Sequence, residues 1–193
     1  MGFFGDAWGV VKDVGAILLS TLLTLWHYAY ILVVMGLNAF KPKIPISDCL
    51  IKVLEELDLL SSNVDLRRVS IIENAIGLAG LGLTNNYTIY ISSSFDEIDD
   101  LWLFLHELKH VEQYQDLGYV VFVATYDYQL VRYGYKNAPL EISASDFATA
   151  NKKSVKDKYD ADCIPGGGPA GDPDSPIFRQ IINEDWTMLL DLI

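Results

Sequence analysis

Hydrophobic and polar positions divide the chain into a long apolar stretch, a patterned middle and a short tail. Between Asp13 and Lys41 no residue carries a formal charge. This run is longer than the roughly 20 apolar residues that cross a bilayer. The residues before it lack the basic region of a cleaved signal peptide. We therefore expect an apolar helical segment over residues 1–43.

The middle of this apolar segment suits a bilayer less well than its ends. Trp26, His27 and Tyr28 lie there, although aromatic side chains favour membrane interfaces and ionisable groups are costly at the bilayer centre. We therefore predict a break near His27 that gives two shorter helices, which contact lipid or pack on the rest of the chain. The length of the run and the lysines that follow it favour membrane contact through residues 14–40.

The middle of the chain, residues 44–155, mixes helical and strand patterns and predicts an α+β domain. Ser47 is a good N-cap for a helix in which apolar residues recur every three to four positions. Strands are expected over 65–72 and 87–91, with a glycine-marked loop between them. The helix that starts at Ser47 is expected to cover 47–60, and three more helices are expected over 98–116, 120–132 and 139–152. Residues 156–193 predict a Gly/Pro-rich linker followed by a helix over 177–192.

Composition narrows the class of partner. The chain has 14 Lys and Arg against 26 Asp and Glu, a net charge of −12. Such an acidic protein lacks the basic surface that phosphate binding requires, so we expect no nucleic-acid partner. The two cysteines, Cys49 and Cys163, match no zinc-binding spacing. One disulfide between them is an alternative, but we favour two free thiols.

The expected helix over 98–116 carries the clearest chemical motif. His106, Glu107 and His110 form an H-E-x-x-H sequence. Histidines four residues apart lie on one face of a helix, where both imidazoles can bind one Zn²⁺. Glu107 lies beside them, in the place of a general base for a metal-bound water. The apolar surroundings strengthen this interpretation, because buried ionisable groups require a compensating partner.

A catalytic zinc site needs a third protein ligand. No histidine follows His110 at a suitable spacing, and His27 lies in the apolar segment. Glu141 is the best candidate, because Pro139 is suited to the first position of a helix and Glu141 would lie in its first turn. The alternative is an ordinary surface carboxylate.

Residues 106–113, His-Glu-Leu-Lys-His-Val-Glu-Gln, together with Asn137-Ala138-Pro139-Leu140-Glu141, resemble gluzincin-type zinc metallopeptidases. Among these they resemble a small bacterial domain found in toxins and in cargo of extracellular contractile injection systems. The resemblance extends weakly upstream to residues 65–69 and 83–90. It implies a zincin-like metallopeptidase fold, with His106, His110 and Glu141 as zinc ligands and Glu107 as base. Ser145 occupies a position where some members have an aspartate.

The resemblance and the motif together predict zinc-dependent hydrolysis of a protein or peptide substrate. Zinc would activate a water, and Glu107 would pass its proton to the leaving amine. The alternative is a non-catalytic, zinc-stabilised interaction domain or membrane-associated domain. A membrane-associated protein or a secreted, delivered effector is favoured over a cytoplasmic one.

Three further features have alternative roles. Gln113 lies one turn beyond His110 and either lines a cleft or ends the helix. A tyrosine could stabilise an oxyanion, although core packing is the commoner role. Residues 87–91 could form an edge strand that pairs with a peptide, but an ordinary strand is favoured. The tyrosines concerned are Tyr126, Tyr128, Tyr133 and Tyr135.

Overall fold

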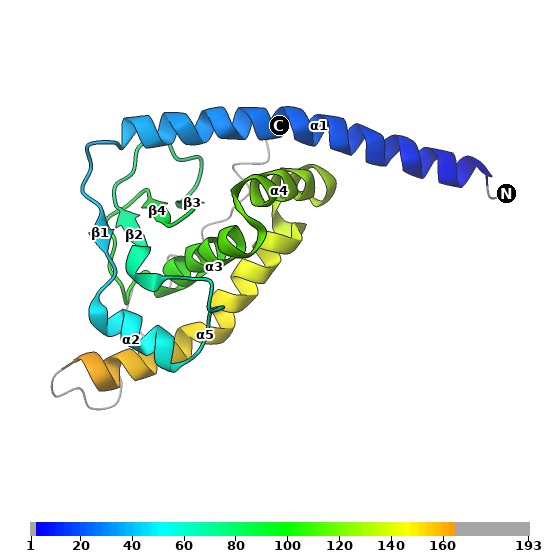
Figure 1. The fold of residues 1–193 in the computed structure, drawn as a ribbon. Coiled ribbons are helices and arrows are strands. Elements are labelled where there is room, and N and C mark those ends of the chain that lie inside the picture. The colour runs from blue at the N-terminus through cyan, green and yellow to red at the C-terminus, as the bar shows by residue number, and fades with distance from the viewer. Residues whose placement is uncertain (1–2, 165–193) are drawn as a thin grey trace.

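The computed structural model describes residues 3–164, with side chains for residue 15 and residues 17–164, and it is a mixed α+β structure (Figure 1). The expected class is confirmed at this level. The α-helices are α1 (Phe3–Leu37), α2 (Asp48–Glu56), α3 (Leu101–Leu117), α4 (Tyr119–Tyr133) and α5 (Pro139–Cys163). The 3₁₀ helices are η1 (Leu66–Arg68) and η2 (Tyr135–Asn137). The strands are β1 (Ile44–Pro45), β2 (Ser70–Ile72), β3 (Gly82–Asn85) and β4 (Thr88–Ile91).

The strands form one small mixed sheet in the order β1-β2-β4-β3. β2 and β4 are parallel, whereas the other two pairs are antiparallel. β4 is therefore an interior strand, which agrees with the preference for an ordinary strand over an edge strand at residues 87–91. β3 is an edge strand, although the sequence predicted a loop for its residues. The β3–β4 hairpin turns at Asn86, whose φ of 55° lies in the left-handed region that asparagine tolerates.

The main core lies between the sheet, α2, α3 and α5. Its largest fully buried side chains come from the sheet, α2 and α3 and include Leu50, Ile89 and Phe104, whereas α5 contributes the smaller Ala148 and Val155. Ser47 caps α2 as predicted, because its Oγ accepts a hydrogen bond of 3.1 Å from the Leu50 backbone. α3 is buried on most sides and lies against β3 and α5. This central helix is thus held rigidly by its neighbours.

The apolar N-terminal segment forms one continuous helix, α1, so the predicted break near His27 is wrong. α1 runs along α4, and its N-terminal turns extend past the rest of the protein (Figure 1). His27 lies on the side that faces the protein, where its Nδ1 is 2.8 Å from Oδ1 of Asp127 on α4. This buried pair removes the need for the break, because the imidazole never has to face an apolar solvent.

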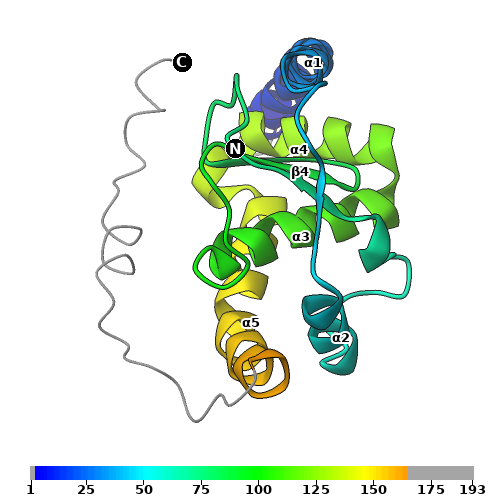
Figure 2. The same ribbon diagram turned by 90° about the vertical axis from the view of Figure 1, so that its left-hand side faces the viewer.

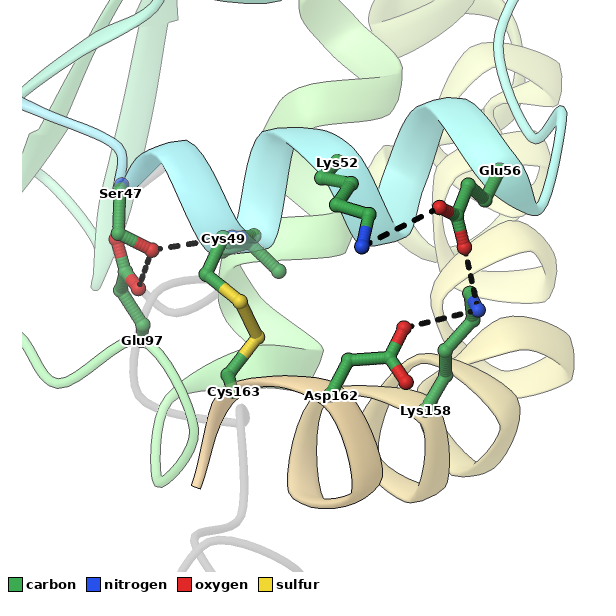
Figure 3. The surroundings of a disulfide bond; sticks show 9 residues. Ser47, Cys49, Lys52, Glu56, Glu97, Lys158, Asp162 and Cys163 are labelled. Atoms are coloured by element: carbon green, nitrogen blue, oxygen red, sulfur yellow. Dashed lines mark hydrogen bonds and ion pairs between the residues drawn. A yellow bond between two sulfur atoms is a disulfide. The ribbon is translucent and has the colours of Figure 1, made fainter. Parts of the chain in front are cut away.

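Cys49 and Cys163 form a disulfide, so the prediction of two free thiols is wrong. The bond joins the start of α2 to the end of α5 (Figure 3). Beside it Lys158 of α5 contacts Glu56 of α2 and Asp162. Figure 2 shows α2 and α5 side by side at the end of the protein opposite α1.

Other boundaries differ from the sequence predictions. α5 continues well beyond Lys152, and the expected domain boundary at 155/156 falls inside it. The expected strand over 65–72 is a 3₁₀ turn followed by the short strand β2. The helix expected over 98–116 begins three residues later, at Leu101, and ends at Leu117. The predicted C-terminal helix over 177–192 lies outside the described residues.

Candidate metal centre

α3 supplies two imidazoles on one buried face. His106 and His110 are only 5% and 6% exposed, and Glu107 between them is 5% exposed. The ring centroids of His106 and His110 lie 4.9 Å apart, in an edge-to-face arrangement. Three ionisable side chains in one buried helical turn are costly unless each has a partner. Whether this buried turn is stable therefore depends on the groups that contact these three side chains.

Glu141, in the first turn of α5, brings its carboxylate to both imidazoles. Its Oε2 lies 3.3 Å from His106 Nε2, and its Oε1 lies 3.4 Å from His110 Nε2. The candidate ligand atoms of the three residues all lie within 4.8 Å of one another. Two atoms each about 2.1 Å from a tetrahedral ion are about 3.4 Å apart, close to the two nitrogen–oxygen separations. This buried group can therefore hold a metal ion.

The donor set also fits a cation electrostatically. Glu141 Oε2 is buried and, apart from its proximity to His106, has no hydrogen-bond partner. Burial alone would raise the pKa of Glu141, but hydrogen bonds to His106, His110 and Tyr126 outweigh it and hold this pKa well below its usual range. The carboxylate is therefore an anion in a buried site. A buried anion with an unpaired oxygen, between two imidazole nitrogens, is a suitable environment for a divalent cation.

A side-chain amide fixes the orientation of His110. Gln113 Oε1 lies 2.8 Å from His110 Nδ1, and Gln113 Nε2 donates to the Leu140 carbonyl at 3.1 Å. The second bond turns the amide oxygen toward the ring, so Nδ1 is the nitrogen that donates to it, and Nε2, which faces Glu141, is the one that would bind an ion after losing its proton. The same amide ties α3 to the turn that carries Glu141. Gln113 thus positions two members of the group.

His106 is held mainly by stacking. Its ring lies 5.2 Å from that of Trp102, nearly parallel to it, one helical turn earlier on α3. Its Nδ1 lies 3.4 Å from Ser145 Oγ, a long contact where a carboxylate would bind more strongly. Ser145 is therefore a weaker partner for this ring than Gln113 is for His110.

Glu107 projects toward the edge strand β3. Thr84 Oγ1 donates to Glu107 Oε2 at 2.7 Å and also lies 3.1 Å from the Glu107 backbone carbonyl. Gly82 leaves space for the rest of the carboxylate, because a Cβ there would lie 2.8 Å from Glu107 Cδ and closer still to Oε1. β3 therefore sets the position of the carboxylate through one hydroxyl and one missing side chain.

Two of the four tyrosines face Glu141. Tyr126 OH donates to Glu141 Oε1 at 2.6 Å, and Tyr135 also hydrogen-bonds to this carboxylate. Burial raises the pKa of Tyr126 well above its ordinary value, and the charge of Glu141 raises it further, so this phenol stays a donor. Tyr128 is part-buried on α4 and Tyr133 is 48% exposed.

Sequence reasoning missed three neighbours of the site and one contact, although one of the neighbours left a signal. Trp102 lies four residues before His106, the spacing of neighbours on a helix face. Thr84, Gly82 and the link from Tyr126 to Glu141 depend on contacts between distant elements and had no local signal. His27 does not reach the site, in agreement with its exclusion as a ligand.

The best-formed hollows in the described part of the chain lie away from this group. One of about 170 Å³ is lined by residues of α2 and the loop after it, including Leu54 and Leu66. The other is lined by Thr149, Lys152 and neighbouring lysines on α5. Neither of these two hollows is lined by His106, His110 or Glu141.

Comparisons with known proteins return nothing: no family model, curated protein or solved structure matches this chain. The resemblance to gluzincins therefore depends on the motif residues alone.

Proposed function

We propose that the protein is a zinc-dependent peptidase that uses Glu107 as its general base. The observation that supports this most is the convergence of His106, His110 and Glu141 within 4.8 Å, with the Glu107 carboxylate on the same buried helical turn. Two imidazole nitrogens and one carboxylate oxygen are a common ligand set for catalytic zinc, which leaves one position open.

Each residue has a defined part in the proposed reaction. Bound zinc supplies a Lewis acid, which lowers the pKa of a water toward about 7 and polarises a carbonyl. Glu107 accepts a proton from the attacking water and delivers it to the leaving amine. The Thr84 hydroxyl, 2.7 Å from Glu107 Oε2, keeps the carboxylate oriented during both transfers. Gln113 holds the proton on Nδ1 of His110.

The edge strand β3 suggests how a peptide would approach. Within the described residues β3 pairs only with β4. An extended peptide that pairs with its other side would pass beside Gly82 and Thr84, the two residues that contact Glu107. We therefore propose a protein or peptide substrate. A toxin or delivered effector that cleaves a target protein is consistent with the gluzincin-like motif.

Substitution of the base tests this function. Glu107→Gln keeps the shape and the hydrogen bond from Thr84 but cannot accept a proton. We expect it to retain zinc and the fold and to lose about 10²–10⁴-fold in rate on a digested peptide library. Glu55→Gln, on the exposed surface of α2, is the matched control and should cleave like the wild type. Equal rates for Glu107→Gln and wild type would refute the catalytic role.

A second candidate is a zinc-stabilised interaction domain without catalysis. The burial of the site favours it, because His106, His110 and Glu141 are only 4–6% exposed and a substrate would have to reach the ion that they hold. In that case zinc removal would lower the melting temperature, but neither wild type nor Glu107→Gln would cleave any library peptide. Cleavage by wild type that stops in the variant would exclude this candidate.

A further inference from the structure

The side of α1 that faces away from the protein is almost entirely apolar. Six large side chains on it are between 58% and 71% exposed. Thr21 is the exposed polar residue of this stretch, and its hydroxyl is bonded to the Ile17 carbonyl of the same helix at 2.8 Å. Such internal satisfaction of hydroxyls is expected where no water is present. The six are Leu18, Leu22, Leu25, Trp26, Leu32 and Val33.

Several polar side chains of the described part of α1, and that of Asn38 directly after it, point toward the protein. His27 pairs with Asp127, and Asn38 exchanges two hydrogen bonds of 2.9 Å with the backbone of Ile76. Tyr30 OH accepts a 2.9 Å bond from the backbone of Ala79. A helix on the surface of a soluble protein has the opposite arrangement, with its apolar side inward. α1 is therefore suited to an apolar medium on its outer side.

We propose that α1 lies in the plane of a lipid bilayer, with its outer side in the acyl-chain boundary and the rest of the protein attached to its inner side. The stretch Ile17–Leu37 is long and apolar enough to cross a membrane, and only 17% of its most apolar window is buried in the protein. A spanning orientation conflicts with the contacts that residues from His27 to Asn38 make with the rest of the protein, which extend over about 17 Å of helix. If α1 crossed the membrane, α4 with Asp127 would enter the hydrocarbon beside it, at high cost.

Lipid fits this surface better than a second copy of the chain does. Interfaces between proteins have an apolar centre and a polar rim. The outer side of α1 has no charged rim, because no Asp, Glu, Lys or Arg lies between Asp13 and Lys41. The first charges after the helix are Lys41 and Lys43, which follow the fully exposed Phe40. Their ammonium groups donate to Asn74 O and Thr88 Oγ1, and each keeps further N–H donors that can meet lipid phosphates.

Vesicle binding and the depth of Trp26 test this proposal on the full chain. We expect the protein to float with phosphatidylcholine vesicles. Leu22→Gln and Leu25→Gln should each weaken binding roughly tenfold, and together about a hundredfold. Ile164→Gln, at an exposed apolar position directly after α5, is the control and should bind like the wild type. Circular dichroism checks that each variant is folded.

Brominated lipids then distinguish the orientation. The fluorescence difference between wild type and Trp26→Phe isolates this side chain, which should be quenched most by bromines near the headgroups. Strongest quenching by bromines near the acyl-chain ends would mean that α1 spans the bilayer, and would overturn the proposal. Failure to float, with dimers in sedimentation instead, would assign the surface to a second copy. None of these readouts depends on the metal or on hydrolysis.

Discussion

Removal of the disulfide between Cys49 and Cys163 should strongly destabilise the protein. The perturbation is the double variant Cys49→Ser/Cys163→Ser, or reduction of the wild type. The bond closes a loop with a sequence separation of 114 residues, and it ties the end of α5 to α2. Glu141 lies in the first turn of the same helix. The stability of α5 therefore bears directly on the proposed metal centre.

The loop length determines the expected magnitude. In the chain-entropy model, opening a loop of about 114 residues raises the entropy of the unfolded state enough to cost about 5 kcal/mol at 25 °C. The packing of Val155 and Tyr159 against the core remains in the reduced protein, so the native state changes little. Measured losses on removal of native disulfides are about 2–5 kcal/mol, so we expect a value in the upper part of this range.

Urea unfolding followed by far-ultraviolet circular dichroism measures the effect. With a denaturant dependence of about 2–3 kcal/mol per molar urea, the midpoint should fall by roughly 2 M on reduction. The double variant should unfold at the midpoint of the reduced wild type and should not respond to reductant. Identical midpoints for oxidised and reduced wild type would refute the proposed pairing. Because such bonds persist in oxidising compartments, the result also bears on a secreted or surface location.

Two other substitutions test how neighbours position the site. Gly82→Ala should push the Glu107 carboxylate aside and lower the rate of peptide hydrolysis about 10²-fold, while the metal content stays unchanged. Gly80→Ala is the control, because a Cβ at this position would have nothing within 4 Å. Equal hydrolysis rates for the two variants would refute the role of β3. Gln113→Ala should weaken zinc binding about 10–100-fold in a competitive chelator titration. Gln115→Ala, which loses only an exposed hydrogen bond to Asn86, should bind zinc like the wild type. Equal zinc affinities for the two variants would contradict the orienting role of Gln113.

Local sequence signals predicted the helices that carry the candidate ligands, and also α2, which packs against one of them. Ser47 indicated the start of α2, and Pro139 indicated the start of α5. The spacing of His106 and His110 predicted their shared face, because it depends on helix geometry alone. The approach of Glu141 to both imidazoles followed from the family resemblance and from its place near a helix start. The structure brings all three together.

The remaining features depend on contacts between distant segments. β3 is a four-residue strand that begins at a glycine, and it becomes a strand only because it pairs with β4. Asp127, which lies a hundred positions from His27, stabilises the imidazole inside a helix where the sequence predicted a break. The last turns of α5 did carry a local signal, the i, i+4 pairs Lys153–Asp157 and Lys156–Asp160, which lie beyond the helix end predicted at residue 152.

The most direct test of the proposed centre is a crystal structure of the zinc-loaded protein with anomalous diffraction at the zinc absorption edge. We expect a single strong peak about 2.0–2.2 Å from His106 Nε2, His110 Nε2 and a carboxylate oxygen of Glu141. The peak should vanish or lose occupancy in Glu141→Gln crystals grown under the same conditions. No peak at these residues, or a peak bound elsewhere with the Glu141 carboxylate turned away, would contradict the account.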